Sequence, residues 1–135
     1  MIISKSATRV PENTPEHLND RILNRTERNV ACAAAGGHEA IRRRLDELDR
    51  EWDIERALIT QASMLALSGM ALGKLKSRYF YLFSFGVLGF LLQHALQGWC
   101  PPVRPMRFLG FRTPREIEDE RHALLLELQR LPDRR

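Results

Sequence analysis

Two uncharged stretches, separated by five residues, constrain the fold of this chain more than any other feature. Residues 57–73 and 79–99 contain no Asp, Glu, Lys or Arg. As α-helices they would extend roughly 25 and 31 Å at ~1.5 Å per residue, against a bilayer hydrocarbon core of about 30 Å. The second stretch has the length and uniformity of a membrane-spanning helix, whereas the first is shorter and carries several polar side chains. The alternative is a soluble helical hairpin that buries its apolar faces in a dimeric four-helix bundle.

Aromatic residues at the ends of both stretches favour the membrane interpretation. In an antiparallel hairpin, Trp52 and Trp99 fall at one end, and Tyr79 and Tyr81 fall at the other. Amphipathic aromatic rings are typical of the two membrane–water interfaces. We therefore expect these four side chains to act as interface anchors.

Small residues at near-helical spacing also favour helices that approach closely in lipid. Gly69 and Gly73 form a GxxxG pattern in the first stretch. The predicted helix-packing positions are Ala62, Ala66, Gly69, Gly73, Gly86 and Gly89.

Two polar side chains match in depth within the expected hairpin. If Ala57 lies level with Gly98, then Gln61 lies level with His94. Each would supply a partner where an unpaired polar group is costly. A proton-relay role for His94 is the alternative, but no carboxylate lies in either stretch. We expect the paired arrangement.

The segment before the hairpin is predicted to be an amphipathic juxtamembrane helix over residues 38–56. No Gly or Pro occurs between Ile41 and Ala62, so we expect this helix to continue directly into the first apolar stretch. Its acidic residues interleave with three consecutive arginines, which favours a solvated face over contact with anionic lipid. Gly36-Gly37 predicts a break from an earlier helix that begins near Asn13. The apolar stripe is Ile41, Leu45, Leu48 and Trp52.

The segment after the hairpin, residues 113–135, is predicted to be a second amphipathic helix. Thr113 can cap it, Pro114 suits the first helical position, and Glu116 completes a capping box. We expect its stripe to pack on the 41–52 stripe of the same or a partner chain. That stripe is Ile117, Leu124, Leu125, Leu128 and Leu131.

Charge and cysteine content exclude several classes of protein. The net charge of +4 is spread along the chain, so there is no basic face typical of nucleic-acid binders. Cys32 and Cys100 are too few for a disulfide framework or a zinc site, and we expect no cofactor. The first ten residues lack the apolar region of a secretory signal.

The distribution of Lys and Arg near the membrane ends predicts the orientation of the hairpin. Residues 42–56 hold five, residues 100–115 hold four and the loop between the two apolar stretches holds three. This distribution predicts that both termini lie in the cytoplasm.

Three motifs resemble the YgaP-like inner-membrane transmembrane domain family, a bacterial two-helix module. They are Asp53 with Arg56 at the entry of the first helix, Gly98-Trp99-Cys100-Pro101 at the exit of the second, and the following turn Leu109-Gly110-Phe111-Arg112-Thr113. The resemblance covers residues 52–118 and implies a dimeric integral inner-membrane protein, in a family whose biochemical role is largely undefined. Some members carry the module after a rhodanese domain. The sequence CAAAGGH after Val30 is not a Cys-x-x-Gly-x-Arg catalytic loop, so sulfur transfer is not carried over.

We therefore expect an all-α fold, a two-helix transmembrane hairpin with flanking amphipathic cytoplasmic helices. The expected segments are an N-terminal tail and short helix (1–37), the juxtamembrane helix (38–56), the hairpin module (57–112) and the C-terminal helix (113–135). The leading function is a non-enzymatic, oligomeric interaction or scaffold module whose partners are the lipid bilayer, a second copy of the chain and a cytoplasmic protein. One alternative is a membrane-interface thiol relay, or redox or sulfur sensor, in which Arg104 and Arg107 lower the pKa of Cys100. The other is the soluble bundle.

Overall fold

The computed structural model describes residues 8–132, and every regular element in that range is an α-helix. The expected all-α fold is confirmed. Residues 1–7 and 133–135 of the expected terminal segments lie outside the described part. In chain order the helices are α1 (Arg9–Glu12), α2 (Glu16–Ala35), α3 (Gly37–Arg50), α4 (Ile54–Leu75), α5 (Tyr79–Gln97), α6 (Val103–Leu109) and α7 (Pro114–Arg130).

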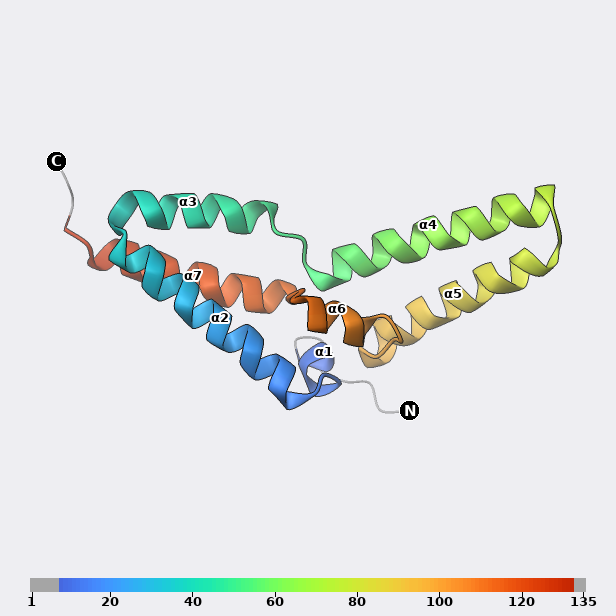
Figure 1. Cartoon of the computed structure of the whole chain (residues 1–135), viewed down its shortest axis with the longest axis horizontal. Coiled ribbons are helices and arrows are strands. Elements are labelled where there is room, and N and C mark those ends of the chain that lie inside the picture. The colour runs from blue at the N-terminus through green and yellow to red at the C-terminus, as the bar shows by residue number, and fades with distance from the viewer. Residues whose placement is uncertain (1–7, 133–135) are drawn as a thin grey trace.

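The helices form two parts that meet at a junction (Figure 1). α2, α3 and α7 pack together at one end, and we call this part the head. α4 and α5 lie side by side and antiparallel, and extend away from the head as an arm, which we call the hairpin. α1 and α6 lie at the junction between them.

The core of the head comes from the apolar stripes of its helices. Ile41 and Leu48 of α3 cluster with Ile117 and Leu124 of α7, and Ala33 of α2 completes the cluster. The predicted packing of the two stripes is confirmed, and it forms within one chain. Two members behave differently from the prediction, because Leu125 and Trp52 are 39% and 46% exposed. The predicted capping box of Thr113 and Glu116 is also confirmed.

The prediction of one continuous helix from Ile41 to Ala62 is wrong. α3 ends at Arg50, and the chain is extended at Glu51 (ψ 129°) and Asp53 (ψ 161°) before α4 begins. The Asp53 carboxylate accepts a hydrogen bond of 2.8 Å from the backbone N–H of Arg56. An aspartate N-cap offers the backbone an alternative to helix continuation, so a new helix starts here without a Gly or Pro.

The Gly98–Pro102 segment ends α5 and leads into a helix that the sequence reasoning did not predict. Gly98 has a φ of 72°, the left-handed conformation that glycine adopts readily at a helix C-cap. Pro101 and Pro102 form a turn, and α6 begins directly at Val103. Proline is unfavourable inside a helix but favourable at its start, so the prolines that stop α5 also begin α6.

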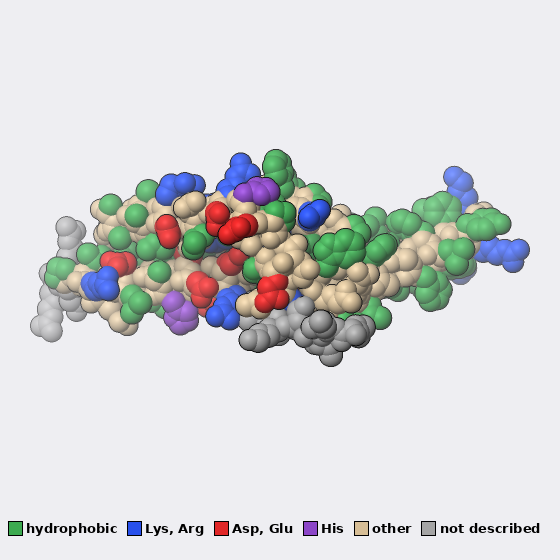
Figure 2. Space-filling model, turned by 90° about the horizontal axis from the view of Figure 1, so that it is seen from below, with side chains coloured by type: hydrophobic (Ala, Val, Ile, Leu, Met, Phe, Trp, Pro, Cys, Tyr) green, Lys and Arg blue, Asp and Glu red, His purple; other side chains and the backbone are tan. Residues whose placement is uncertain are grey.

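The hairpin exposes many large apolar side chains, and they cover much of the face of the hairpin that Figure 2 shows. Two helical stretches are long and apolar enough to cross a membrane. One contains α4 and the other is α5. Basic side chains lie at the end of the hairpin farthest from the head, where Lys74, Lys76 and Arg78 flank the α4–α5 turn. Charged side chains of both signs are otherwise concentrated on the head.

Candidate functional site

The junction concentrates the buried polar groups of this chain, and two arginines dominate it. Arg107 on α6 and Arg112 just after it are both fully buried, at 0% exposure. Gly110, with a φ of 94°, ends α6 and turns the chain. The turn places Arg112 directly before Thr113, the N-cap of α7. The acceptors of both guanidinium groups come from α2, from α7 and from the segments that follow α3 and α6.

The Arg107 guanidinium is held by side chains of α7 and α2. Its two terminal nitrogens donate to the carboxylate oxygens of Glu116 at 2.6 and 2.8 Å. One of them also donates to Asn19 Oδ1 at 2.7 Å. This fork-to-fork geometry is the strongest form of arginine–carboxylate pairing.

Arg112 occupies the centre of a larger cluster. Its guanidinium donates to both oxygens of Glu51 at 2.8 and 2.6 Å, and to Thr26 Oγ1 at 3.1 Å. It also pairs with Glu120, which is fully buried. Glu120 in turn accepts a hydrogen bond of 2.7 Å from Arg44 Nε on α3. We call the set Arg44, Glu51, Arg107, Arg112, Glu116 and Glu120 the arginine network.

The arginines of the network keep its carboxylates ionised. Burial alone would raise the pKa of Glu120, but hydrogen bonds from Arg44 and Arg112 outweigh it and hold that pKa below its ordinary value. The pKa of Glu116 is lowered in the same way, because the hydrogen bond from Arg107 overcomes the effect of burial. Removing one partner of such a buried pair costs about 3–5 kcal/mol. The arginine network therefore stabilises the packing of the head.

Sequence reasoning missed this network, because it assigned the charges of the head to solvated faces. A signal was present in the sequence. Glu116, Glu120 and Leu124 are four residues apart, so these glutamates share the face that Leu124 buries. A carboxylate on a buried face requires a cationic partner.

The network is joined to the hairpin through the backbone. The N–H of Ile54, the first residue of α4, donates to the carbonyl of Arg112 at 2.8 Å. Ile54 also belongs to an apolar cluster that spans the junction. Its buried members are Val10, Ile54, Leu58, Cys100, Val103 and Met106.

α1 fastens the two junction ends of the hairpin. Arg9 pairs with Glu55 of α4 at 2.7 Å, and the Asn13 side chain donates to the carbonyl of Gln97 at 3.0 Å. A Cβ on Gly98 would lie 2.6 Å from Arg9 Cβ, so a side chain there would push α1 away. Glycine is thus required at this position by both its φ and its close contact.

The predicted Gln61–His94 pair does not form. Gln61 is exposed, while His94 is 4% exposed and neither of its ring nitrogens has a hydrogen-bond partner among residues 8–132. Equal depth in two antiparallel helices does not ensure contact, because the two side chains lie on different faces of their helices. His94 is instead buried in the last turn of α5, at the junction end of the hairpin.

The Cys100 thiol is not activated by its surroundings. It is 3% exposed within the junction cluster, and this burial raises its pKa. The expected lowering by Arg104 and Arg107 is wrong, because Arg107 is engaged with Glu116 and Arg104 is exposed. Cys32 is exposed on α2.

The small residues divide into two groups. Ala62, Ala66 and Gly69 are buried against α5, where a Cβ on Gly69 would lie 2.3 Å from Ser84 Oγ. A Cβ on Gly73 would lie 2.8 Å from the Tyr81 ring. Gly86 and Gly89 have open space beside them, because a Cβ added at either position would meet no atom of the described residues within 4 Å. These two therefore leave a shallow strip on the outer face of α5.

The aromatic residues lie at the ends of the hairpin. Trp52 directly precedes α4 and Trp99 follows α5, so both flank the junction end. Tyr79 and Tyr81 begin α5 at the opposite end. The Arg56 guanidinium lies 4.6 Å from the centre of the Trp52 ring, a cation–π contact that holds the indole at the junction surface.

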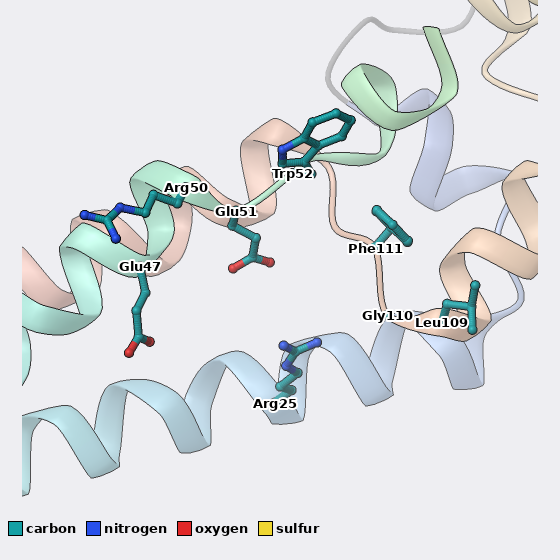
Figure 3. Close-up of a pocket in the computed structure, with 8 residues that line it drawn as sticks. All are labelled: Arg25, Glu47, Arg50, Glu51, Trp52, Leu109, Gly110 and Phe111. Atoms are coloured by element: carbon teal, nitrogen blue, oxygen red, sulfur yellow. The ribbon is translucent and has the colours of Figure 1, made fainter. Parts of the chain in front are cut away.

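An open pocket of about 460 Å³ lies at the junction (Figure 3). Its lining comes from α2, the end of α3, the link to α4 and the end of α6. Arg25 rises from α2 toward Glu51, while Leu109 and Phe111 lie on the α6 side. Within residues 8–132, no group of three or more His, Cys, Asp or Glu side chains is arranged to hold a metal ion.

Comparison of the chain with protein family models, with curated proteins and with solved structures gave no match.

Proposed function

We propose that the chain is a small integral inner-membrane protein, in which α4 and α5 span the bilayer and the head lies in the cytoplasm. Its role is to present the head as a non-enzymatic interaction or scaffold module that assembles with a second copy. The resemblance of residues 52–118 to the YgaP-like module supports the same proposal.

The exposed apolar surface of the hairpin carries this proposal. Only 11% of the apolar α5 window is buried, whereas the core helix of a soluble protein is mostly buried. Each large side chain moved out of water would contribute about 1.5–3 kcal/mol. The exposed large side chains are Ile59, Met64, Leu65, Leu67, Met70, Leu72 and Leu75 on α4, and Tyr79, Tyr81, Leu82, Phe83, Phe85, Leu88, Phe90 and Leu92 on α5.

The length and the ends of the hairpin suit this placement. α4 has 22 residues and α5 has 19. At ~1.5 Å per residue these helices would extend about 33 and 28 Å, close to the hydrocarbon thickness. The two tryptophans flank the end nearest the head. The excess of Lys and Arg beside that end favours a cytoplasmic head.

The outer strip of α5 supports assembly of a second copy. Gly86 and Gly89 allow the backbone of another helix to approach closely, the usual basis of helix association in lipid. Gly69 already packs against Ser84 within the hairpin, so it does not offer a surface to a second copy.

Membrane insertion and orientation can be tested together. The test protein is a Cys100→Ser variant, whose remaining thiol is the exposed Cys32 of the head. A matched variant, Cys32→Ser/Cys100→Ser/Ser77→Cys, carries its thiol in the α4–α5 turn. We expect both proteins to stay in membranes washed with alkaline carbonate. In intact cells an impermeant maleimide should then label the turn variant but not the head.

Two results would contradict the proposal. Release of both proteins by carbonate would identify a soluble helical bundle. Labelling of Cys32 in intact cells, with the turn thiol protected, would reverse the orientation. For assembly, oxidation of a cysteine-free background carrying Gly86→Cys should give disulfide dimers, whereas Met70→Cys on exposed α4 should not.

A further inference from the structure

The carboxylates that line the junction pocket are paired with arginines, whereas the arginines that line it have no carboxylate partner among residues 8–132. Glu51 is held by two nitrogens of the buried Arg112, and Glu47 pairs with Arg44 at 2.8 Å. Among residues 8–132, neither Arg25 nor Arg50 has an ion-pair partner. The pocket therefore presents an excess of positive charge to an incoming group.

Arg25 is placed to contact an anion inside the pocket. It points from α2 toward the link that carries Glu51 (Figure 3), and its Nη1 lies 3.1 Å from where a Cβ on Gly110 would be. Arg50 lies on the α3 rim of the same pocket. Guanidinium groups bind phosphate through charge-assisted, often bidentate hydrogen bonds.

An apolar groove adjoins this pocket and follows the hairpin. The groove measures about 600 Å³ and lies between α4 and α6. It shares Trp52, Leu109 and Phe111 with the charged pocket, so the two adjoin at these side chains. Beyond these shared residues it passes over Met64 and Leu65 of α4. The polar end thus lies at the head, and the apolar end follows the helix that we place in the bilayer.

We propose that the charged pocket and the groove together bind one acidic glycerophospholipid. Its phosphate would contact Arg25, while Arg50, whose side chain points away from Arg25 in Figure 3, would add positive charge at the rim. One acyl chain would follow the α4–α6 groove. The inference rests on the proposed membrane placement of the hairpin. A soluble phosphate could use the charged pocket but would leave the groove empty, so the position of an apolar groove next to the charged pocket favours a lipid.

Trp52 lines both the charged pocket and the apolar groove, so its fluorescence can report a lipid bound there. The test uses the full chain with Trp99→Phe, reconstituted in bilayers that contain a small fraction of lipid with a brominated acyl chain. Brominated phosphatidylglycerol should quench Trp52 more strongly than brominated phosphatidylcholine at the same mole fraction. Substituting both Arg25→Gln and Arg50→Gln should lower this preference about tenfold, since a hydrogen bond to a charged group contributes about 1.5–3 kcal/mol.

A matched variant separates the site from general attraction to an acidic surface. Arg42→Gln/Arg43→Gln removes the same charge from exposed positions of α3 that do not line the pocket, and it should keep the preference. Equal loss in both double variants would overturn the proposal. So would loss of the preference on adding millimolar inorganic phosphate or glycerol phosphate, because the headgroup alone would then account for binding.

The two proposals fail in different ways. Each variant is first washed with alkaline carbonate in membranes. Release of the unsubstituted protein refutes the membrane placement. A protein that stays in the membrane, but whose Trp52 is quenched equally by both lipids, refutes the lipid site alone.

Discussion

Replacing Glu120 by Gln tests whether the arginine network stabilises the head. Glu120 is fully buried and contacts two arginines, Arg44 and Arg112. At an effective dielectric constant of 20, each charge pair about 4 Å apart gains roughly 4 kcal/mol. Neutralising the carboxyl group also removes the cost of burying its charge, which is several kcal/mol. Because the amide oxygen still accepts one hydrogen bond, we expect a net loss of about 3 kcal/mol, the low end of the range for a broken buried pair.

The loss can be measured by urea unfolding of the protein in mild detergent, followed through Trp52 fluorescence in a Trp99→Phe background. With a urea dependence of about 1–3 kcal/mol per molar, the midpoint should fall by roughly 1–3 M. Glu118→Gln is the matched control on the same helix. Glu118 is exposed and, among residues 8–132, pairs only with Arg121, at 3.2 Å, so we expect about 0–1 kcal/mol. If the two variants differ by less than about 0.5 kcal/mol, the network does not stabilise the head and the reasoning is refuted.

Three further outcomes follow from the same contacts. Burial opposes ionisation of Glu120, but its arginine partners hold its pKa below the ordinary value, so its contribution to the stability of the head is fully present above about pH 4.3. It is lost as the pH falls through the lowered pKa, and acid titration of the urea midpoint should show a fall that Glu120→Gln weakens. The buried Cys100 should react with maleimide at least about tenfold more slowly than the exposed Cys32 in the folded protein, and equally fast in denaturant; equal rates in the folded state would contradict its raised pKa and burial. Gly69→Ala should destabilise α4–α5 packing by about 1–3 kcal/mol, because its methyl group would overlap Ser84. Gly86→Ala has open space within one chain and should leave α4–α5 packing unchanged, and thermal unfolding of the detergent-solubilised monomer distinguishes the two variants.

Patterns of periodicity and capping predicted the main helices because these depend on nearby residues. Thr113, Pro114 and Glu116 defined the start of α7 through contacts within one helical turn. The apolar stripes of α3 and α7 likewise predicted their mutual packing. Local signals also explain the one missed break, since Asp53 is a good N-cap and can start a helix where neither Gly nor Pro is present.

The junction could not be predicted in the same way, because its contacts join residues far apart in the chain. Arg112 is 61 residues from Glu51 and 86 from Thr26. The charge pattern alone does not distinguish an arginine that faces water from one that is buried against a distant glutamate. The predicted Gln61–His94 pair failed for a different reason. Equal depth along two antiparallel helices does not tell which face of each helix turns toward the other helix.

The head takes its core from both sides of the hairpin in the sequence, and this has a consequence for the order in which the protein forms. Ala33, Ile41 and Leu48 are synthesised before α4 and α5, while Ile117 and Leu124 follow them. A nascent chain that has not yet released α7 lacks two of these five residues, and its Arg44 lacks Glu120. Completion of the head must therefore wait until α5 has returned beside α4. A folded head therefore requires that both apolar helices have been synthesised and that their junction ends lie close together.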